Sequence, residues 1–260
     1  MTKIQASVYI ICQDEEDNIA RVLTSVSDFD EVIVVDSGST DQTLEIAATF
    51  ENCKIHSHDW QGYAKQKRTA KSLCRHPWVL SLDADQVLSP ALREEIRAMI
   101  ADDQGFDALD GPIVGNDYLL KPSHPWTRYN TAIKFFKKDK GDYLDVSVHE
   151  SIHVTGRVKK TSAPIYHHGN EKIDEAIDKV NRYSSLIVID KLKKGKQPRL
   201  LKLLFVFPLA FFKSYILKRN FLNGRGGFIG STCQAFYAFL KEAKLHYAQV
   251  KPEDFDQQAS

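Results

Sequence analysis

Residues 78–85 read WVLSLDAD, an apolar run that ends in two carboxylates separated by one residue. Two earlier runs have the same apolar, β-branched character: ASVYIIC at 6–12 and EVIVVD at 31–36. Helical periodicity separates and follows these runs, at 18–26, after Thr40, at 63–73 and after Ser89-Pro90. Strands and helices that alternate in this order predict an α/β fold with a parallel, doubly wound sheet.

The carboxyl ends of two predicted strands are acidic, at Asp36 and Asp83. In open α/β sheets ligands bind beyond these ends, so we expect the functional side chains to gather along one edge. The sequence contains neither G-x-G-x-x-G nor G-x-x-x-x-G-K-[ST], which argues against dinucleotide and P-loop sites. Asp83 and Asp85 can instead hold a hard divalent cation and leave positions open for phosphate oxygens.

The composition is that of an ordinary globular chain of 260 residues, 43% hydrophobic and 27% charged, with a net charge of +1. It excludes collagen-like, disordered and disulfide-dense proteins. The four cysteines are far apart and form no C-x-x-C pair, which argues against a zinc site and for reduced cytosol. The first residues lack the features of a signal peptide, so we expect a cytoplasmic protein.

Three motifs in the first half of the chain carry a family resemblance: DEEDNI at 14–19, VVDSGSTD at 34–41 and DAD at 83–85. With these motifs the sequence resembles family 2 glycosyltransferases of the GT-A fold. Three more resemble a subgroup of that family, the bacterial lipopolysaccharide-core β-1,4-glucosyltransferases: WQGYAKQK at 60–67, VHE at 148–150 and FLNGRGGF at 221–228. The chain departs from the pattern at Asp14 and Arg68, where Asn is more usual.

The resemblance implies that Glu15, Asp36, Lys67 and Asp83 bind the nucleotide sugar. A carboxylate at Asp36 can accept hydrogen bonds from the uracil or ribose of a UDP-sugar, whose buried polar groups need such partners. Lys67 is expected to contact the donor phosphates, with surface charge as the alternative. Glu15 is either a second nucleotide contact or an acidic residue favoured at a helix N-terminus.

The resemblance also implies that Asp83 and Asp85 hold Mg²⁺ or Mn²⁺ against the diphosphate. Such an ion neutralises the charge that develops on departing UDP. His167 follows a predicted strand and is expected as a third metal ligand. The alternative for this residue is a hydrogen-bonded loop histidine.

An inverting transfer, which the resemblance implies, needs a carboxylate that takes the proton from the attacking acceptor hydroxyl. Glu150 matches the acidic residue of the family at this point and is the expected base. Asp145 is the reserve candidate, and a surface strand glutamate is the alternative interpretation of Glu150.

The same stretch contains the H-E-x-x-H signature of zinc metallopeptidases, as His149-Glu150-Ser151-Ile152-His153. That motif needs both histidines on one face of a helix. Apolar residues in DVSVHESIHV alternate with period two, which predicts a strand, where histidines four positions apart stand roughly 13 Å apart. We therefore disfavour the peptidase hypothesis.

The resemblance divides the chain into a GT-A catalytic domain at 1–170 and a helical, membrane-associating extension at 171–260. Within the first, 1–104 is expected to bind the nucleotide sugar and 105–170 the acceptor.

Charge is distributed unevenly: the net charge is −7 over 1–189, +9 over 190–225 and −1 over 226–260. The basic segment contains LLFVFPLAFF at 203–212, which Pro208 interrupts and which is shorter than the about 20 residues needed to span a bilayer. Apolar residues with flanking cations favour a helix lying on an anionic membrane surface, with a core helix as the alternative. Nucleic acid is not an expected partner because the rest of the chain is acidic.

Together these features predict a metal-dependent, inverting hexosyltransferase on the cytoplasmic face of the bacterial inner membrane. The subgroup resemblance implies that it moves glucose from UDP-glucose to a lipid-linked saccharide, a sugar of the lipopolysaccharide inner core. A polyprenyl-phosphate sugar transferase is the alternative with the same chemistry.

Overall fold

The computed structural model describes residues 2–115, 123–124, 126–143, 151–168, 173–251 and 255. The chain divides into two compact units. The sheet unit comprises Met1–Val114, Asn130–Asp145 and His149–His168. The helical unit comprises Gly115–Tyr129, Val146–Val148 and Gly169–Ser260. The domain boundaries predicted from the sequence, after residues 104 and 170, stay a prediction.

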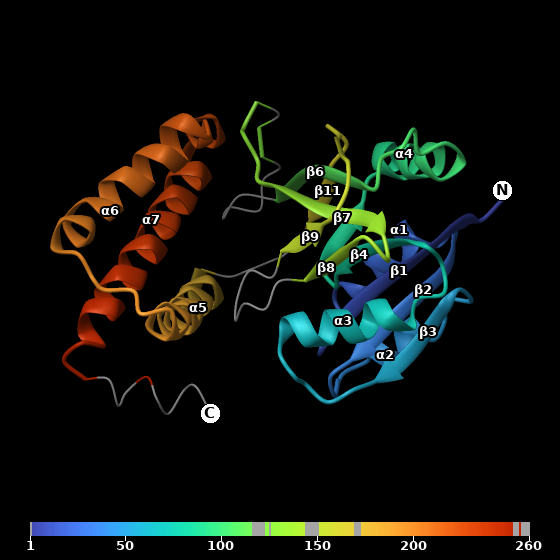
Figure 1. The fold of residues 1–260 in the computed structure, drawn as a ribbon, viewed down its shortest axis with the longest axis horizontal. Coiled ribbons are helices and arrows are strands. Elements are labelled where there is room, and N and C mark those ends of the chain that lie inside the picture. The colour runs from blue at the N-terminus through green and yellow to red at the C-terminus, as the bar shows by residue number, and fades with distance from the viewer. Residues whose placement is uncertain are drawn as a thin grey trace. The chain divides into compact units, whose positions relative to one another are not determined.

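Four parallel strands in the order β3-β2-β1-β4 begin the sheet (Figure 1). They are β1 (Ile4–Cys12), β2 (Phe29–Asp36), β3 (Cys53–Ser57) and β4 (Trp78–Asp83). The register pairs Cys12 with Asp36 and Ile11 with Asp83, so the acidic strand ends lie along the same edge. The predicted parallel sheet is confirmed over this half of the chain.

Helices cover both faces of these strands: α1 (Ile19–Ser25), α2 (Thr43–Ala47), α3 (Tyr63–Leu73) and α4 (Pro90–Ala101). One core joins alternate residues of β1, such as Val8 and Ile10, to α1, α2 and α4. The opposite core joins Tyr9 to α3 through Ala64 and Ala70. Successive residues of β1 thus point into opposite cores, as a strand buried on both faces requires. Because helices cover both faces, the sheet is doubly wound.

Helix α4 begins as the sequence predicts. The Ser89 hydroxyl accepts a hydrogen bond from the backbone N–H of Leu92 at 3.1 Å, and Pro90 occupies the first turn. Pro fits there because its missing N–H would have no intrahelical partner.

The second half of the sheet unit is mixed. Its strands are β5 (Gln86–Leu88), β6 (Ala108–Gly115), β7 (Thr131–Lys137), β8 (Gly141–Tyr143), β9 (Ile152–Val154), β10 (Val158–Lys160) and β11 (Ile165–His167). Strand β7 is antiparallel to β4, and β11 is antiparallel to β5. The predicted strands near 134–136 and 165–167 are present, whereas the one predicted at 144–148 lies outside the described residues.

The helical unit contains α5 (Ile173–Lys193), α6 (Leu200–Phe212), a π-helical turn η1 (Lys213–Leu217), a 3₁₀ turn η2 (Asn220–Asn223) and α7 (Gly224–Tyr247). Helix α7 packs against α5 and α6. Gly227 lies where a Cβ would come within 1.8 Å of the Asn220 carbonyl oxygen, so only glycine permits this approach of η2 to α7.

The prediction that Pro208 interrupts the apolar segment is wrong. The helical backbone is continuous over Leu200–Leu217, and this stretch of 18 residues is long and apolar enough to cross a membrane by length and composition. Pro208 lies exposed inside α6, so the hydrogen bond that it removes faces solvent rather than a packed core. Only 6% of the stretch is buried in the structure.

Candidate active site

The loops after β1 and β2 are joined by backbone-to-side-chain hydrogen bonds. The backbone N–H of Asp14 donates to Ser39 Oγ at 2.9 Å, and the N–H of Thr40 donates to Asp14 Oδ1 at 2.8 Å. The N–H of Glu16 donates to Asp41 Oδ2 at 3.0 Å. These bonds fix the two loops at the carboxyl edge of the sheet, and they give Asp14 a structural role.

Asp36 is buried, with 2% of its surface exposed, and its carboxylate orders the loop that follows it. It accepts hydrogen bonds from the backbone N–H of Gly38 at 2.9 Å and of Ser39 at 3.1 Å, and from the Ser39 hydroxyl at 2.5 Å. Gly38 has a φ of 101°, a conformation that favours glycine. The nucleotide contact of Asp36 stays a prediction, and loop ordering is a second role that the sequence did not indicate.

Glu15 lies half-buried before α1. Its backbone N–H donates to Thr43 Oγ1 at 2.7 Å, and its Oε2 accepts a hydrogen bond from Asn18 Nδ2 at 3.0 Å. Glu15 therefore contacts both the first helical turn and the start of α2. Its predicted contact with the nucleotide stays a prediction.

Asp83, at the end of β4, lies between two lysines. Lys67 Nζ is 2.7 Å from Asp83 Oδ1, and Lys134 Nζ is 2.9 Å from Asp83 Oδ2. Burial opposes charge on this carboxyl, but the attraction of Lys134 and Lys67 outweighs it and holds the pKa of Asp83 far below its usual range. The carboxylate is therefore ionised at neutral pH and keeps two ammonium groups in fixed positions.

Lys134 is a site residue that the sequence analysis missed. It lies on β7, and its side chain is 12% exposed. The antiparallel pairing of β7 with β4 brings it to Asp83 across 51 residues of sequence. The only signal in the sequence is a lysine in the middle of the strand-like run TAIKFFK at 131–137.

Asp85 and His167 form a second pair of contacting side chains in the site. His167 lies on β11, whose register places it opposite Gln86 on β5. His167 Nε2 is 2.8 Å from Asp85 Oδ2, while Asp85 Oδ1 is buried without a hydrogen-bond partner. A buried carboxylate oxygen without a partner is unfavourable unless a donor or a cation reaches it.

Asp85 and His167 therefore fit a divalent cation as a pair of ligands. The oxygens of Asp83 are already engaged by lysines, and within the described ranges no three His, Cys, Asp or Glu side chains form a metal-binding group. The metal role predicted for Asp83 stays a prediction. Diphosphate oxygens and water would have to complete the coordination of Mg²⁺, which keeps several non-protein ligands.

A hollow of about 320 Å³ opens beside the two lysines. Lys67 and Lys134 line it, together with Tyr143 of β8. The Tyr143 hydroxyl is buried in hydrogen bonds with Tyr9 at 2.6 Å and Ser81 at 2.7 Å. Fixed cations facing a hollow beyond the strand ends can hold the phosphate groups of a nucleotide sugar.

Arg68 and Gln66 of α3 make side-chain contacts with neighbouring segments of the sheet unit. Arg68 donates a hydrogen bond to the Tyr143 carbonyl and lies 3.5 Å from Asp142, so it supports β8. Gln66 is fully buried and donates to Ser37 Oγ and to the His58 carbonyl, both at 3.0 Å. Sequence reasoning gave neither side chain this role.

The predicted base Glu150 lies outside the described residues, as do Asp145 and His149. His153 belongs to β9 and pairs with Asp142 of β8. The predicted strand is confirmed there, and a metallopeptidase helix is not formed at His153.

A doubly wound sheet with carboxylates and lysines at its carboxyl edge is the arrangement expected of an enzyme that binds a phosphorylated ligand, such as a nucleotide sugar, beyond the strand ends. A family model described as Glycosyl transferase family 2 matches residues 7–160, and the chain belongs to this family.

Curated relatives match almost the whole chain. Lipopolysaccharide core biosynthesis glycosyltransferase LpsC of Rhizobium meliloti is 33% identical over 94% of this chain and 93% of its own. An uncharacterized glycosyltransferase of Rickettsia felis is 34% identical over 98% of this chain and 93% of its own. The crystal structure of S. aureus TarS 1–349 in complex with UDP-GlcNAc has a TM-score of 0.50 at 19% identity, over 96% of this chain and 89% of that chain. This likeness shows a common fold.

Proposed function

We propose that the protein transfers a hexose, glucose, from UDP-glucose to a sugar of the lipopolysaccharide inner core, with inversion at the anomeric carbon. The acceptor is supported by the similarity to LpsC, whose name places it in lipopolysaccharide core biosynthesis. A UDP-sugar donor is supported by the fold shared with TarS, which was crystallised with UDP-GlcNAc. The choice of glucose rests on the sequence resemblance.

One observation carries the proposal: Asp83 is held by Lys67 and Lys134 beside the Asp85–His167 pair, where β4 ends. The lysines line the adjacent hollow, where they can neutralise diphosphate oxygens. Asp85 and His167 would hold a divalent cation, which supplies further neutralisation of the leaving UDP when it is bound. Glu150 is proposed to take the proton from the acceptor hydroxyl as that oxygen attacks the sugar.

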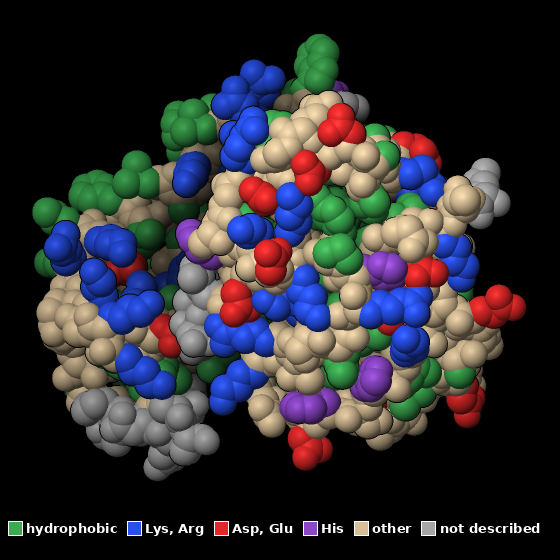
Figure 2. Space-filling model, turned by 45° about the vertical axis from the view of Figure 1, so that its right-hand side comes forward, with side chains coloured by type: hydrophobic (Ala, Val, Ile, Leu, Met, Phe, Trp, Pro, Cys, Tyr) green, Lys and Arg blue, Asp and Glu red, His purple; other side chains and the backbone are tan. Residues whose placement is uncertain are grey.

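We also propose that the protein works on the cytoplasmic face of the inner membrane. The apolar side chains on one side of α6 are exposed, among them Leu200, Leu201, Leu204 and Leu209, each at 60% or more. Figure 2 shows hydrophobic side chains grouped on the surface of the helical unit, with Lys and Arg side chains beside them. Such a surface favours contact with anionic lipid.

A donor screen tests the proposed activity. Thermal unfolding would be followed with UDP-glucose, UDP-galactose, UDP-GlcNAc and GDP-mannose, each with and without Mn²⁺. We expect UDP-glucose to raise the melting temperature most, and more strongly with Mn²⁺, because a ligand that binds only the native state stabilises it. The absence of a shift with every UDP compound would overturn the proposal.

A further inference from the structure

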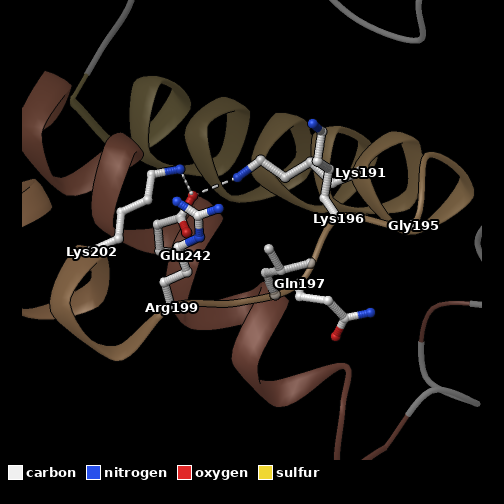
Figure 3. Close-up of a pocket in the computed structure, with 8 residues that line it drawn as sticks. Lys191, Gly195, Lys196, Gln197, Arg199, Lys202 and Glu242 are labelled. Atoms are coloured by element: carbon white, nitrogen blue, oxygen red, sulfur yellow. Dashed lines mark hydrogen bonds and ion pairs between the residues drawn. The ribbon is translucent and has the colours of Figure 1, made fainter.

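The helical unit has a hollow of its own, with a volume of about 600 Å³ (Figure 3). It lies where α5 ends, α6 begins and α7 passes. Four cations line it, Lys191, Lys196, Arg199 and Lys202, against one carboxylate, Glu242. All these residues belong to the helical unit, so this hollow is distinct from the candidate active site.

Glu242 lines this hollow and forms ion pairs with two of its lysines. Its side chain is 4% exposed, and its Oε1 lies 2.6 Å from Lys191 Nζ and 2.7 Å from Lys202 Nζ. Burial alone would raise the pKa of Glu242, but the hydrogen bonds from Lys191 and Lys202 lower it, so the carboxylate stays charged. One buried anion thereby fixes two cations that come from different helices.

The remaining charge is not balanced within the hollow. Glu242 is paired with Lys191 and Lys202, whereas Lys196 and Arg199 form no ion pair with an acidic side chain among the described residues (Figure 3). The hollow therefore presents excess positive charge to a ligand.

The chemistry of the lining indicates the class of ligand. None of the described residues that line the hollow is aromatic, so the lining offers no platform on which a nucleobase would stack. Lysine and arginine together favour a phosphate group. The exposed apolar side of α6 starts at the rim with Leu200, Leu201 and Leu204, next to Arg199 and Lys202. A ligand that joins a phosphate to acyl chains satisfies both surfaces.

We propose that this hollow binds the phosphate group of an anionic lipid, whose chains lie along the exposed side of α6. The site would fix where the helical unit sits on a membrane, beyond the general attraction of a basic segment to anionic lipid. The proposal does not depend on which sugar the enzyme transfers.

Binding to the full-length protein tests the site. The probes are short-chain phosphatidylglycerol below its micelle concentration, inorganic phosphate, and vesicles of phosphatidylcholine with or without phosphatidylglycerol. The site variant combines Lys196→Ala with Arg199→Ala, both exposed and unpaired by acidic groups. The control combines Lys193→Ala with Lys194→Ala, which removes the same charge from exposed residues outside the hollow.

We expect the site variant to bind short-chain phosphatidylglycerol about tenfold more weakly than wild type, because it loses two charge-assisted contacts. The control should remain within about twofold of wild type. Vesicle binding should follow the same order, and the thermal shift with UDP-glucose should be equal in all three proteins. That last readout separates loss of this site from failure of the proposed transferase activity.

Three results would overturn the proposal. Equal weakening in both double variants would mean diffuse attraction to the basic segment rather than a site. Inorganic phosphate that binds as tightly as short-chain phosphatidylglycerol would assign the hollow to a free anion rather than a lipid. Unchanged lipid binding in the site variant would exclude the hollow altogether.

Discussion

The two units of this protein contain the same local arrangement, a carboxylate held between two lysines from separate elements. In the sheet unit Asp83 lies between Lys67 and Lys134, and in the helical unit Glu242 lies between Lys191 and Lys202. Their surroundings differ. Asp83 is 34% exposed and sits beside another carboxylate, whereas Glu242 is 4% exposed and faces further cations.

This difference separates two ways of binding phosphate. Near Asp83, Asp85 and the histidine that contacts it would be ligands for a metal ion between protein and phosphate. Around Glu242, Lys196 and Arg199 add positive charge, which suits an anion bound without metal. The arrangement around Asp83 is thus expected to govern catalysis, and the one around Glu242 stability and membrane contact.

The largest effect is expected from Glu150→Gln. Removing a general base typically costs 10²–10⁴-fold in rate, so we expect turnover with UDP-glucose and a sugar acceptor to fall about a thousandfold. A phosphate acceptor is already ionised and needs less help from a base. Unchanged turnover would therefore contradict the sugar-hydroxyl acceptor and favour polyprenyl phosphate. Donor binding, followed by thermal shift, serves as the folding control.

Asp85→Asn should lower turnover about a hundredfold, because it removes the charge of a proposed metal ligand whose Oδ1 is buried without a partner. Manganese affinity, measured by electron paramagnetic resonance, should fall in parallel. Stability should change by about 1 kcal/mol or less, since Oδ1 has no hydrogen bond to lose and the Oδ2 contact with His167 is partly exposed. Wild-type manganese binding in this variant would mean that the ion is held elsewhere.

Lys134→Ala should raise the KM for UDP-glucose about tenfold, because one of two phosphate-facing cations is lost from the hollow. Lys140→Ala removes an equal charge from an exposed turn nearby and is the matched control. Steady-state kinetics with both variants would check the expectation. If the two variants behave alike, Lys134 acts through overall charge and not as a donor contact.

Much of the fold could be predicted from sequence because the signals are local. The apolar runs of β1, β2 and β4 match buried strands, and helical periodicity at 63–73 matches α3 residue for residue. Paired acids at a strand end likewise identified Asp83 and Asp85. These features depend on neighbours in the chain and on the two-residue and 3.6-residue periods.

What the sequence did not indicate depends on pairing over long distances. Lys134 reaches Asp83 only through the register of β7 against β4. Gln66 and Glu242 are polar residues in helices, where a polar position ordinarily predicts exposure, and both are buried by contacts with distant segments. Pro208 was expected to leave the apolar segment too interrupted to span a bilayer, because the tolerance of an exposed helix position for Pro is not visible in local sequence.

Glu242→Gln should lower the free energy of unfolding by about 2 kcal/mol at neutral pH. Breaking a buried ion pair is costly, but Lys202 is 54% exposed, which reduces the effect. Asp83→Asn should cost about 1 kcal/mol, since its side chain is 34% exposed and the amide oxygen still accepts a hydrogen bond from one of the two lysines. Denaturant unfolding followed by circular dichroism would compare them. A larger loss for Asp83→Asn would reverse the assignment of stability to the helical unit.

The smallest expected effect is the pH dependence of the difference in unfolding free energy between wild type and Glu242→Gln. Because Lys191 and Lys202 lower the pKa of Glu242 below its usual 4.5, the folded state binds its proton less readily than the unfolded chain. The stabilisation is therefore complete at neutral pH, declines as the pH falls below about 4.5, and disappears once the folded-state carboxyl is protonated. The stability gap between wild type and Glu242→Gln should close over that range, while the gap for Glu51→Gln, an exposed glutamate, stays near zero. A gap that persists at acidic pH would mean that shape and packing at this position, and not its charge, stabilise the helical unit.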